Sequence, residues 1–400
     1  MAVVYTPIED RYYWNWSRFP VVNAHIVFDA YDPESIFVEF GLKLQQNYFT
    51  KNKKHPLIFP QKIEHLKHNP GSRLILDLCT ESWWPPTIPG SNFWHIIYTN
   101  LIKAGVRPQQ IHFITNNHVQ QQLFKSGFPN SRHSHINWWE IFTYYHNTQA
   151  RLAENTTYKF GFFNRTLREE RVSLAYQLLT DKDFVANSLY SIQGRSCQTW
   201  NDPEQSDELV KKVTDYFPSE GNEYTPSRTS IQAWVDTNPW KLLPESMDPQ
   251  GKVYEYNTYF YDGIYNATAA CDILITSETN IDGPASLFMA TEKVSRPICI
   301  GKPFIALSTD NYFAHFEEMG YKSFASVWNE NYNNTRDVHL KTHSVVKLIK
   351  ELNNATAHEF NAMLTCANEI AAHNKHTIQQ RTQYSAILSN FDPELRRLFK

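Results

Sequence analysis

An adjacent acid and base, Glu292 and Lys293, lie between a polar loop and a largely apolar run that ends at Gly301-Lys302-Pro303. Backbone N–H groups at the start of a helix favour phosphate, and a lysine placed there adds a positive charge. The pair therefore predicts an anion site, with a phosphate group as the expected ligand. The alternative is a surface Glu–Lys pair on an ordinary helix, which would bind nothing.

The segments on either side of this pair are typical of a parallel α/β sheet. Residues 271–278 form an apolar run that predicts a buried strand ending in the carboxylate of Glu278, and residues 303–307 predict a second strand. A polar loop and a helix separate the two strands. Ligands of open α/β sheets bind beyond the carboxyl ends of the strands. Glu278, Glu292 and Lys293 therefore lie where a ligand is expected.

The sequence offers little for a metal site. Its one Asp-x-Asp, Asp181-Lys-Asp183, lies between a predicted helix and a predicted strand, where acidic residues commonly form turns. The chain has no His-Glu-x-x-His, no Gly-x-x-x-x-Gly-Lys-Ser/Thr and no Gly-x-Gly-x-x-Gly. Cationic side chains are therefore the expected partners of a phosphate group, and neither a metal nor a cofactor is predicted.

Two blocks of the chain resemble the donor-site signature of the α1,3-fucosyltransferases and of related bacterial and phage-encoded proteins. The first block comprises Ser277-Glu-Thr-Asn280, Thr291-Glu-Lys293, Arg296-Pro297 and Gly320-Tyr-Lys-Ser-Phe324. The second block is Lys159-Phe-Gly-Phe-Phe-Asn-Arg165. The resemblance covers residues 155–195 and 270–335, which is less than half of the chain.

This resemblance implies the GT-B layout, in which two Rossmann-like parallel-sheet domains face a cleft, here with C-terminal helices. It implies an inverting, metal-independent glycosyltransferase. Such an enzyme moves a sugar from a nucleotide-diphosphate donor, which is a co-substrate, to a glycan or another hydroxyl acceptor. Residues 1–150 would form the acceptor domain and residues 155–400 the donor domain. The donor-binding residues would be Asn164, Arg165, Arg171, Glu278, Glu292 and Lys293.

Two departures from the family pattern leave some roles open. The loop before Arg171 is one residue longer than in the pattern, so Arg165 and Arg168 compete with it for the diphosphate. Arg171 could equally be an exposed helix residue. The longer loop from Glu278 to Glu292 leaves the role of Glu278 and the identity of the sugar open. In the family, Glu292 would lie near the ribose or the transferred sugar, which also makes it a catalytic candidate.

A general base must take the proton from the acceptor hydroxyl, and it should come from the first domain. Asp77 and Glu81 are the first candidates because they lie at the end of the predicted strand 72–79. His118 and Glu140 are the next candidates.

Composition describes an ordinary globular protein of 400 residues, with 42% hydrophobic and 20% charged residues, long enough for two domains. A net charge of −3 gives no general attraction for nucleic acid or anionic membrane, so nucleic acid is not the expected acceptor. Five cysteines without a Cys-x-x-Cys pair indicate buried thiols in a reducing compartment. The sequence shows no signal peptide and no apolar run of the ~18 residues that a membrane span needs. We therefore expect a cytoplasmic protein without a membrane span.

Hydrophobic periodicity predicts strands alternating with helices, which is typical of parallel sheets. The predicted strands are residues 72–79, 110–115, 158–163, 184–190, 271–278 and 303–307. The predicted helices are residues 34–47, 91–104, 117–126, 167–179, 342–353 and 356–389. A polar stretch, residues 147–157, is the expected linker between the domains.

Two other classes of protein fit the same residues. One is a different enzyme on the same scaffold, such as a nucleotide-sugar epimerase, which would act without an acceptor. The other is a non-catalytic nucleotide- or carbohydrate-binding protein, which would keep the phosphate site and lack a base. A nucleotide-sugar hydrolysis assay separates a glycosyltransferase from the binding protein, and an epimerised sugar nucleotide formed without an acceptor indicates the epimerase.

Overall fold

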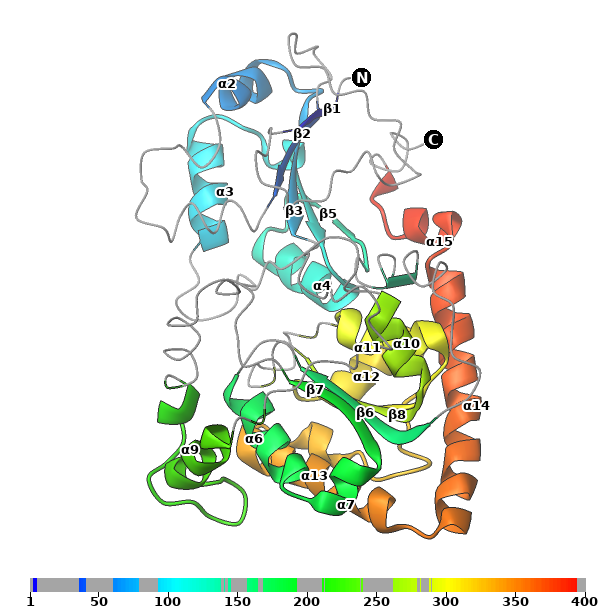
Figure 1. The fold of residues 1–400 in the computed structure, drawn as a ribbon. Coiled ribbons are helices and arrows are strands. Elements are labelled where there is room, and N and C mark those ends of the chain that lie inside the picture. The colour runs from blue at the N-terminus through cyan, green and yellow to red at the C-terminus, as the bar shows by residue number, and fades with distance from the viewer. Residues whose placement is uncertain are drawn as a thin grey trace. The chain divides into compact units, whose positions relative to one another are not determined.

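The structure of the chain is a computed structural model that describes residues 3–5, 36–40, 60–78, 93–137, 140, 143–144, 157–164, 168–192, 211, 213–237, 239, 262–278, 281, 288 and 290–393. The chain divides into two compact units, Met1–Trp138 with Arg381–Lys400, and Trp139–Gln380 (Figure 1). The predicted ranges 1–150 and 155–400 differ from this division in two respects. The boundary falls earlier in the chain, and the C-terminal segment belongs to the first unit.

The first unit contains a parallel five-stranded sheet, and its strands follow one another in sequence order. The strands are β1 (Val3–Tyr5), β2 (Ile36–Phe40), β3 (Arg73–Leu78), β4 (Ile111–Thr115) and β5 (Arg132–His135). The helices are α2 (Pro60–His68), α3 (Phe93–Lys103) and α4 (His118–Gly127), with a 3₁₀ turn, η2, at Pro108–Gln110. Because every crossover advances in one direction and such crossovers are right-handed, the three α-helices are expected on one face of the sheet.

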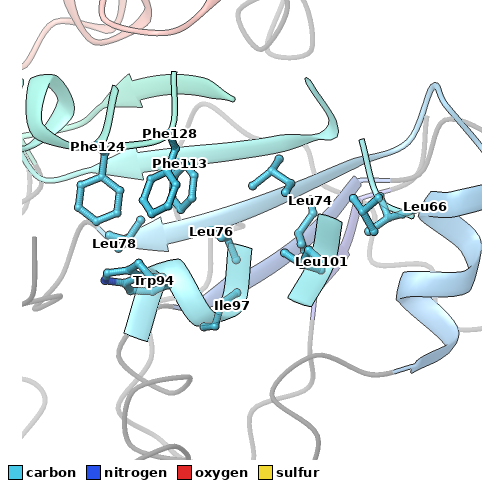
Figure 2. Close-up of a cluster of buried hydrophobic side chains, with 12 residues drawn as sticks. Leu66, Leu74, Leu76, Leu78, Trp94, Ile97, Leu101, Phe113, Phe124 and Phe128 are labelled. Carbon is cyan, nitrogen blue, oxygen red and sulfur yellow. The ribbon is translucent and has the colours of Figure 1, made fainter. Parts of the chain in front are cut away.

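The core of the first unit agrees with this arrangement. Leu74, Leu76 and Leu78 alternate along β3 and turn one face of the sheet towards α3 (Figure 2). Trp94 of α3 is fully buried and contacts Phe113 of β4 edge to face, with ring centroids 6.5 Å apart. The same cluster includes Leu66 of α2, Ile97 and Leu101 of α3, Phe124 of α4 and Phe128, the residue after α4.

The C-terminal segment returns to β4 and β5 of the same unit through polar contacts. His112 and Ser134 lie on these neighbouring strands, and their side chains are hydrogen-bonded at 2.8 Å. The backbone N–H of Asp392 donates to the same Ser134 hydroxyl at 2.8 Å, and the Asp392 carboxylate pairs with Arg132 at 3.1 Å. This contact explains why the last residues of the chain belong to the first unit.

The second unit contains a parallel four-stranded sheet with the order β7-β6-β8-β9. The strands are β6 (Tyr158–Asn164), β7 (Ser188–Ile192), β8 (Cys271–Ser277) and β9 (Phe304–Leu307). From β6 the chain moves to β7 on one side, and the later strands add on the other side. The strand order therefore reverses between β6 and β8. Open α/β sheets bind ligands beyond the carboxyl ends of the strands at such a reversal.

Helices lie on both faces of this second sheet, as Figure 1 shows. The β6–β7 and β8–β9 crossovers advance in opposite directions, so right-handedness places α6 (Glu169–Leu179) and α11 (Glu292–Ile300) on opposite faces. The remaining helices are α7 (Lys182–Ala186), α9 (Arg228–Asp236), α10 (Asp262–Ala269), α12 (Tyr312–Glu318), η4 (Asn331–Asn334), α13 (Val338–Asn354), α14 (Ala357–Arg381) and, in the first unit, α15 (Tyr384–Ser389). None of the described helices is long and apolar enough to cross a membrane.

Most of the predicted elements are confirmed, and two are wrong. The predicted helix at 34–47 is wrong because residues 36–40 form β2, whose β-branched and aromatic side chains suit pairing with β3. The predicted strand at 184–190 begins as the end of α7, and β7 starts only at Ser188. The predicted linker at 147–157 lies outside the described residues except for its last residue, Thr157.

Candidate functional site

The carboxylate of Glu278 lies directly after β8 and links three elements of the second unit. Its side chain accepts hydrogen bonds from the backbone N–H of Thr291 at 2.9 Å and from the Thr291 hydroxyl at 2.5 Å. The hydroxyl of Tyr312, at the start of α12, donates to the same carboxylate at 3.2 Å. Glu278 is only 1% exposed, so these hydrogen bonds replace the water that it loses.

Burial has the largest effect on this group and raises the pKa of Glu278 above its ordinary value. The charge of Lys293 and the two hydrogen bonds from Thr291 act in the opposite direction. Burial, with the charge of Glu278, raises the pKa of Tyr312 well above its ordinary value. Tyr312 therefore stays protonated as a donor to Glu278.

Helix α11 begins at this carboxylate. Thr291 is its N-cap, and the Thr291 hydroxyl accepts from the backbone N–H of Lys293 at 3.3 Å. The helix ends at Gly301, whose φ of 80° is the left-handed conformation that glycine tolerates at a helix C-terminus. The largely apolar run that was noted in the sequence thus forms α11, and Gly301 ends it.

Glu292 and Lys293, the first two residues of α11, form an ion pair with 2.9 Å between Oε1 and Nζ. Their side chains are 17% and 23% exposed, so water screens the pair only in part. Burial opposes ionisation of Glu292, but the charge and hydrogen bond of Lys293, with the charge of Arg296, lower the pKa of Glu292 to about 2. Glu292 is therefore ionised at neutral pH.

Arg171 of α6 is 4% exposed, which excludes the exposed helix residue that the sequence left as an alternative. Its Nη2 donates to the backbone carbonyl oxygens of Ser277 at 3.3 Å and Glu278 at 3.2 Å. Its Nε donates to the Ser277 hydroxyl at 3.4 Å. Burial lowers the pKa of Arg171, and the charge of Glu170 opposes this shift. The guanidinium thus places a buried positive charge at the carboxyl end of β8.

Asn164, the last residue of β6, is 8% exposed. Phe162 pairs with Ile275, so the same register places Asn164 beside Ser277, at the reversal of strand order. Among the described residues, the side-chain Nδ2 of Asn164 has no hydrogen-bond partner. A buried donor without a partner is rare in proteins and commonly marks a place where a ligand or water binds.

The other predicted residues fall on other elements or outside the described residues. Arg165 and Glu81 lie outside the described residues, whereas Arg168 is the half-buried N-cap of α6. Asp77 lies within β3, in register with Phe40 and Ile114, and belongs to the first unit.

The two further base candidates fall in different units. His118 starts α4 in the first unit, whereas Glu140 is buried and belongs to the second. Asp181 caps α7 by accepting from the backbone N–H groups of Asp183 and Phe184, which is the turn role that the sequence suggested.

The segment Gly320–Phe324 is a supporting element. The side chain of Asn374, in the second half of α14, accepts from the backbone N–H of Lys322 at 2.7 Å and donates to the Lys322 carbonyl at 2.9 Å. His373 bonds the carbonyl of Gly320 at 3.0 Å, and Phe324 is fully buried against Trp328. Sequence reasoning missed Asn374 and Tyr312, because their partners lie 52 and 34 positions away and no local pattern marks them.

Comparison with family models and with curated proteins found no match for this chain.

Proposed function

We propose that the second unit binds the diphosphate of a nucleotide sugar at the carboxyl ends of β6 and β8, and that the protein transfers the sugar to a glycan or another hydroxyl acceptor. The observation that carries this proposal is the position of Lys293, at the start of α11 and beside a reversal of strand order. Arg171 adds a second positive charge to the same edge, and Asn164 adds a side-chain N–H donor that has no partner among the described residues.

These groups suit the chemistry of an inverting transfer without a metal. As the bond between the sugar and the diphosphate breaks, negative charge builds up on the leaving oxygen. Fixed cations stabilise that charge more in the transition state than in the bound donor. The acceptor hydroxyl attacks the opposite face of the sugar and gives its proton to a carboxylate. Asp77 and Glu81 of the first unit remain the candidates for this base. Glu292 is a further catalytic candidate, near the transferred sugar.

The proposal extends to the layout of the chain. The two parallel-sheet units correspond to the two Rossmann-like domains of a GT-B glycosyltransferase, with the donor site in the second. The resemblance of the blocks 159–165 and 277–324 to the α1,3-fucosyltransferases supports this assignment. The location that fits such an enzyme, with a nucleotide sugar as co-substrate, is the cytoplasm.

Calorimetry on the Lys293→Ala variant tests the donor site, with a panel of nucleoside diphosphates titrated in the presence of EDTA. A charge-assisted contact contributes about 1.5–3 kcal/mol, so we expect affinity to fall by about tenfold to over a hundredfold. Lys347→Ala, which changes an exposed lysine on α13, is the matched control and should bind like wild type. Equal affinity of the folded Lys293→Ala protein and wild type, or binding that requires Mg²⁺ or Mn²⁺, would reject the cationic site.

A donor-turnover assay separates the enzyme from the alternatives. Slow hydrolysis of a nucleotide sugar, accelerated by a sugar acceptor, supports transfer. Binding without any turnover indicates a non-catalytic binding protein, and an epimerised nucleotide sugar formed without an acceptor indicates the epimerase class.

A further inference from the structure

The ion pair between Glu292 and Lys293 is not an ordinary pair on a helix surface. Residues that face one another on a helix are three or four positions apart, and adjacent residues diverge. Glu292 and Lys293 are adjacent, yet their charged atoms are 2.9 Å apart and both side chains are largely buried. The two side chains therefore curl together over the start of α11.

The carboxylate of Glu292 lies where an anionic ligand of α11 would be expected. Its pKa is lowered by Lys293, by Arg296 and by the backbone N–H of Glu292 itself, which is the first N–H of the helix. Glu292 also contributes to the electrostatic environment of the buried Arg171. The side chain thus interacts with the same cations and helix N-terminus that would bind a phosphate group.

We propose that Glu292 is a built-in counter-ion: it neutralises Lys293 in the free protein, and only a ligand with two or more negative charges displaces it. This inference rests on the proposed function and names what the donor site selects, namely diphosphates over singly charged anions.

The selectivity follows from an exchange of charges. A singly charged anion that replaces Glu292 breaks one ion pair of Lys293 and forms another of the same kind. It therefore gains no net interaction with Lys293. A diphosphate brings several oxygens and at least two charges, so it can bind Lys293 and still interact with Arg171 and the helix N–H groups. The Nδ2 of Asn164, which has no partner among the described residues, is an additional donor at the same sheet edge.

Calorimetric titration with pyrophosphate and with acetate, in wild type and Glu292→Gln, tests this inference. Glutamine keeps the size of the side chain and removes its charge. We expect pyrophosphate to bind Glu292→Gln more tightly than wild type by about tenfold or more. In the variant, the ligand no longer has to break the charge-assisted hydrogen bond between Glu292 and Lys293. Acetate should bind the variant measurably and wild type not. Glu351→Gln, which removes an exposed carboxylate of α13, is the matched control for net charge and should match wild type.

Glu292→Asp is a second variant in case glutamine disturbs the helix start. It keeps a carboxylate at the first turn and shortens its reach to Lys293, so tighter pyrophosphate binding is expected here as well. Unchanged or weaker pyrophosphate binding in both folded variants overturns the counter-ion role, as does a lack of binding in wild type and variants alike.

The outcomes separate this inference from the proposed function. If nucleoside diphosphates bind wild type and Lys293→Ala abolishes that binding, but Glu292→Gln does not tighten it, the donor site stands and the counter-ion role fails. If Glu292→Gln tightens pyrophosphate binding but nucleoside diphosphates bind no better than pyrophosphate, the counter-ion role stands and the nucleotide-sugar proposal fails.

Discussion

Thr291 donates two hydrogen bonds to the carboxylate of Glu278, from its backbone N–H to Oε1 at 2.9 Å and from its hydroxyl to Oε2 at 2.5 Å. The two residues are 13 positions apart, and this contact fixes the start of α11 to the end of β8. Because Lys293 lies two residues beyond Thr291, the same contact positions the cation of the proposed donor site.

Thr291→Val and Glu278→Met should each destabilise the protein by about 1.5–3 kcal/mol, because each leaves a buried partner without its hydrogen bond. The double variant should lose less than the sum, since both changes remove the same contact. Urea unfolding gives the three free energies of unfolding. Thr365→Val, at an exposed position of α14, is the control and should change stability by less than about 0.5 kcal/mol. Strict additivity would mean that the contact does not couple the strand and the helix.

Arg171→Met should destabilise the second unit, because the apolar side chain leaves the carbonyl oxygens of Ser277 and Glu278 without the guanidinium. The loss should be about 2–3 kcal/mol, as expected for buried hydrogen bonds to a charged group. Arg171→Lys should recover part of it. If Arg171 also binds the diphosphate, folded Arg171→Lys should bind nucleoside diphosphates more weakly than wild type. Wild-type affinity in that variant would leave Arg171 with a structural role alone.

Glu330 should make the protein less stable as pH rises. It is 8% exposed, and neither carboxylate oxygen has a partner in hydrogen-bonding geometry among the described residues. Burial raises the pKa of Glu330 to about 8, although Trp328 and the backbone of Phe324 offset part of the shift. A group whose pKa is raised by folding contributes its full stabilisation at pH values below its pKa in the unfolded chain. That stabilisation is lost as pH rises to its pKa in the folded protein.

The free energy of unfolding of Glu330→Gln should therefore rise relative to that of wild type as pH rises from 4.5, the ordinary pKa, to about 8, the pKa in the folded protein. Above about pH 8 the difference between the two proteins should stay constant. The slope should approach about 1.4 kcal/mol per pH unit. Thermal or urea unfolding at several pH values measures the gap. The exposed Glu351→Gln variant should run parallel to wild type. A gap that stays constant with pH would mean that Glu330 is ionised in the folded protein.

Ser134→Ala should destabilise the first unit by about 1–3 kcal/mol, because it removes the shared partner of His112 and of the Asp392 backbone. Ser131 supplies a matched control, since its hydroxyl has no hydrogen-bond partner among the described residues. Ser131→Ala should be close to neutral. Equal unfolding free energies for the two variants would show that the contact with the C-terminal segment contributes nothing to stability.

The sequence by itself determined most of the local elements and the edge of the sheet that carries the candidate site. Strands β3, β4 and β8 were predictable because buried parallel strands are short apolar runs. Helix α11 was predictable from its N-terminal polar loop and the glycine at its end. Glu278 and Lys293 could be assigned to one sheet edge because the carboxyl ends of parallel strands lie together.

Only the tertiary structure decided what lies far apart along the chain. The β2 segment, for which a helix was predicted, forms a strand because β1 and β3 pair with it on either side. Arg171 is buried because the end of β8, 106 positions away, supplies its acceptors. The C-terminal segment returns to the first unit through Ser134, 258 positions away from Asp392. Such contacts depend on how distant segments pack, and local periodicity carries no information about packing of that kind.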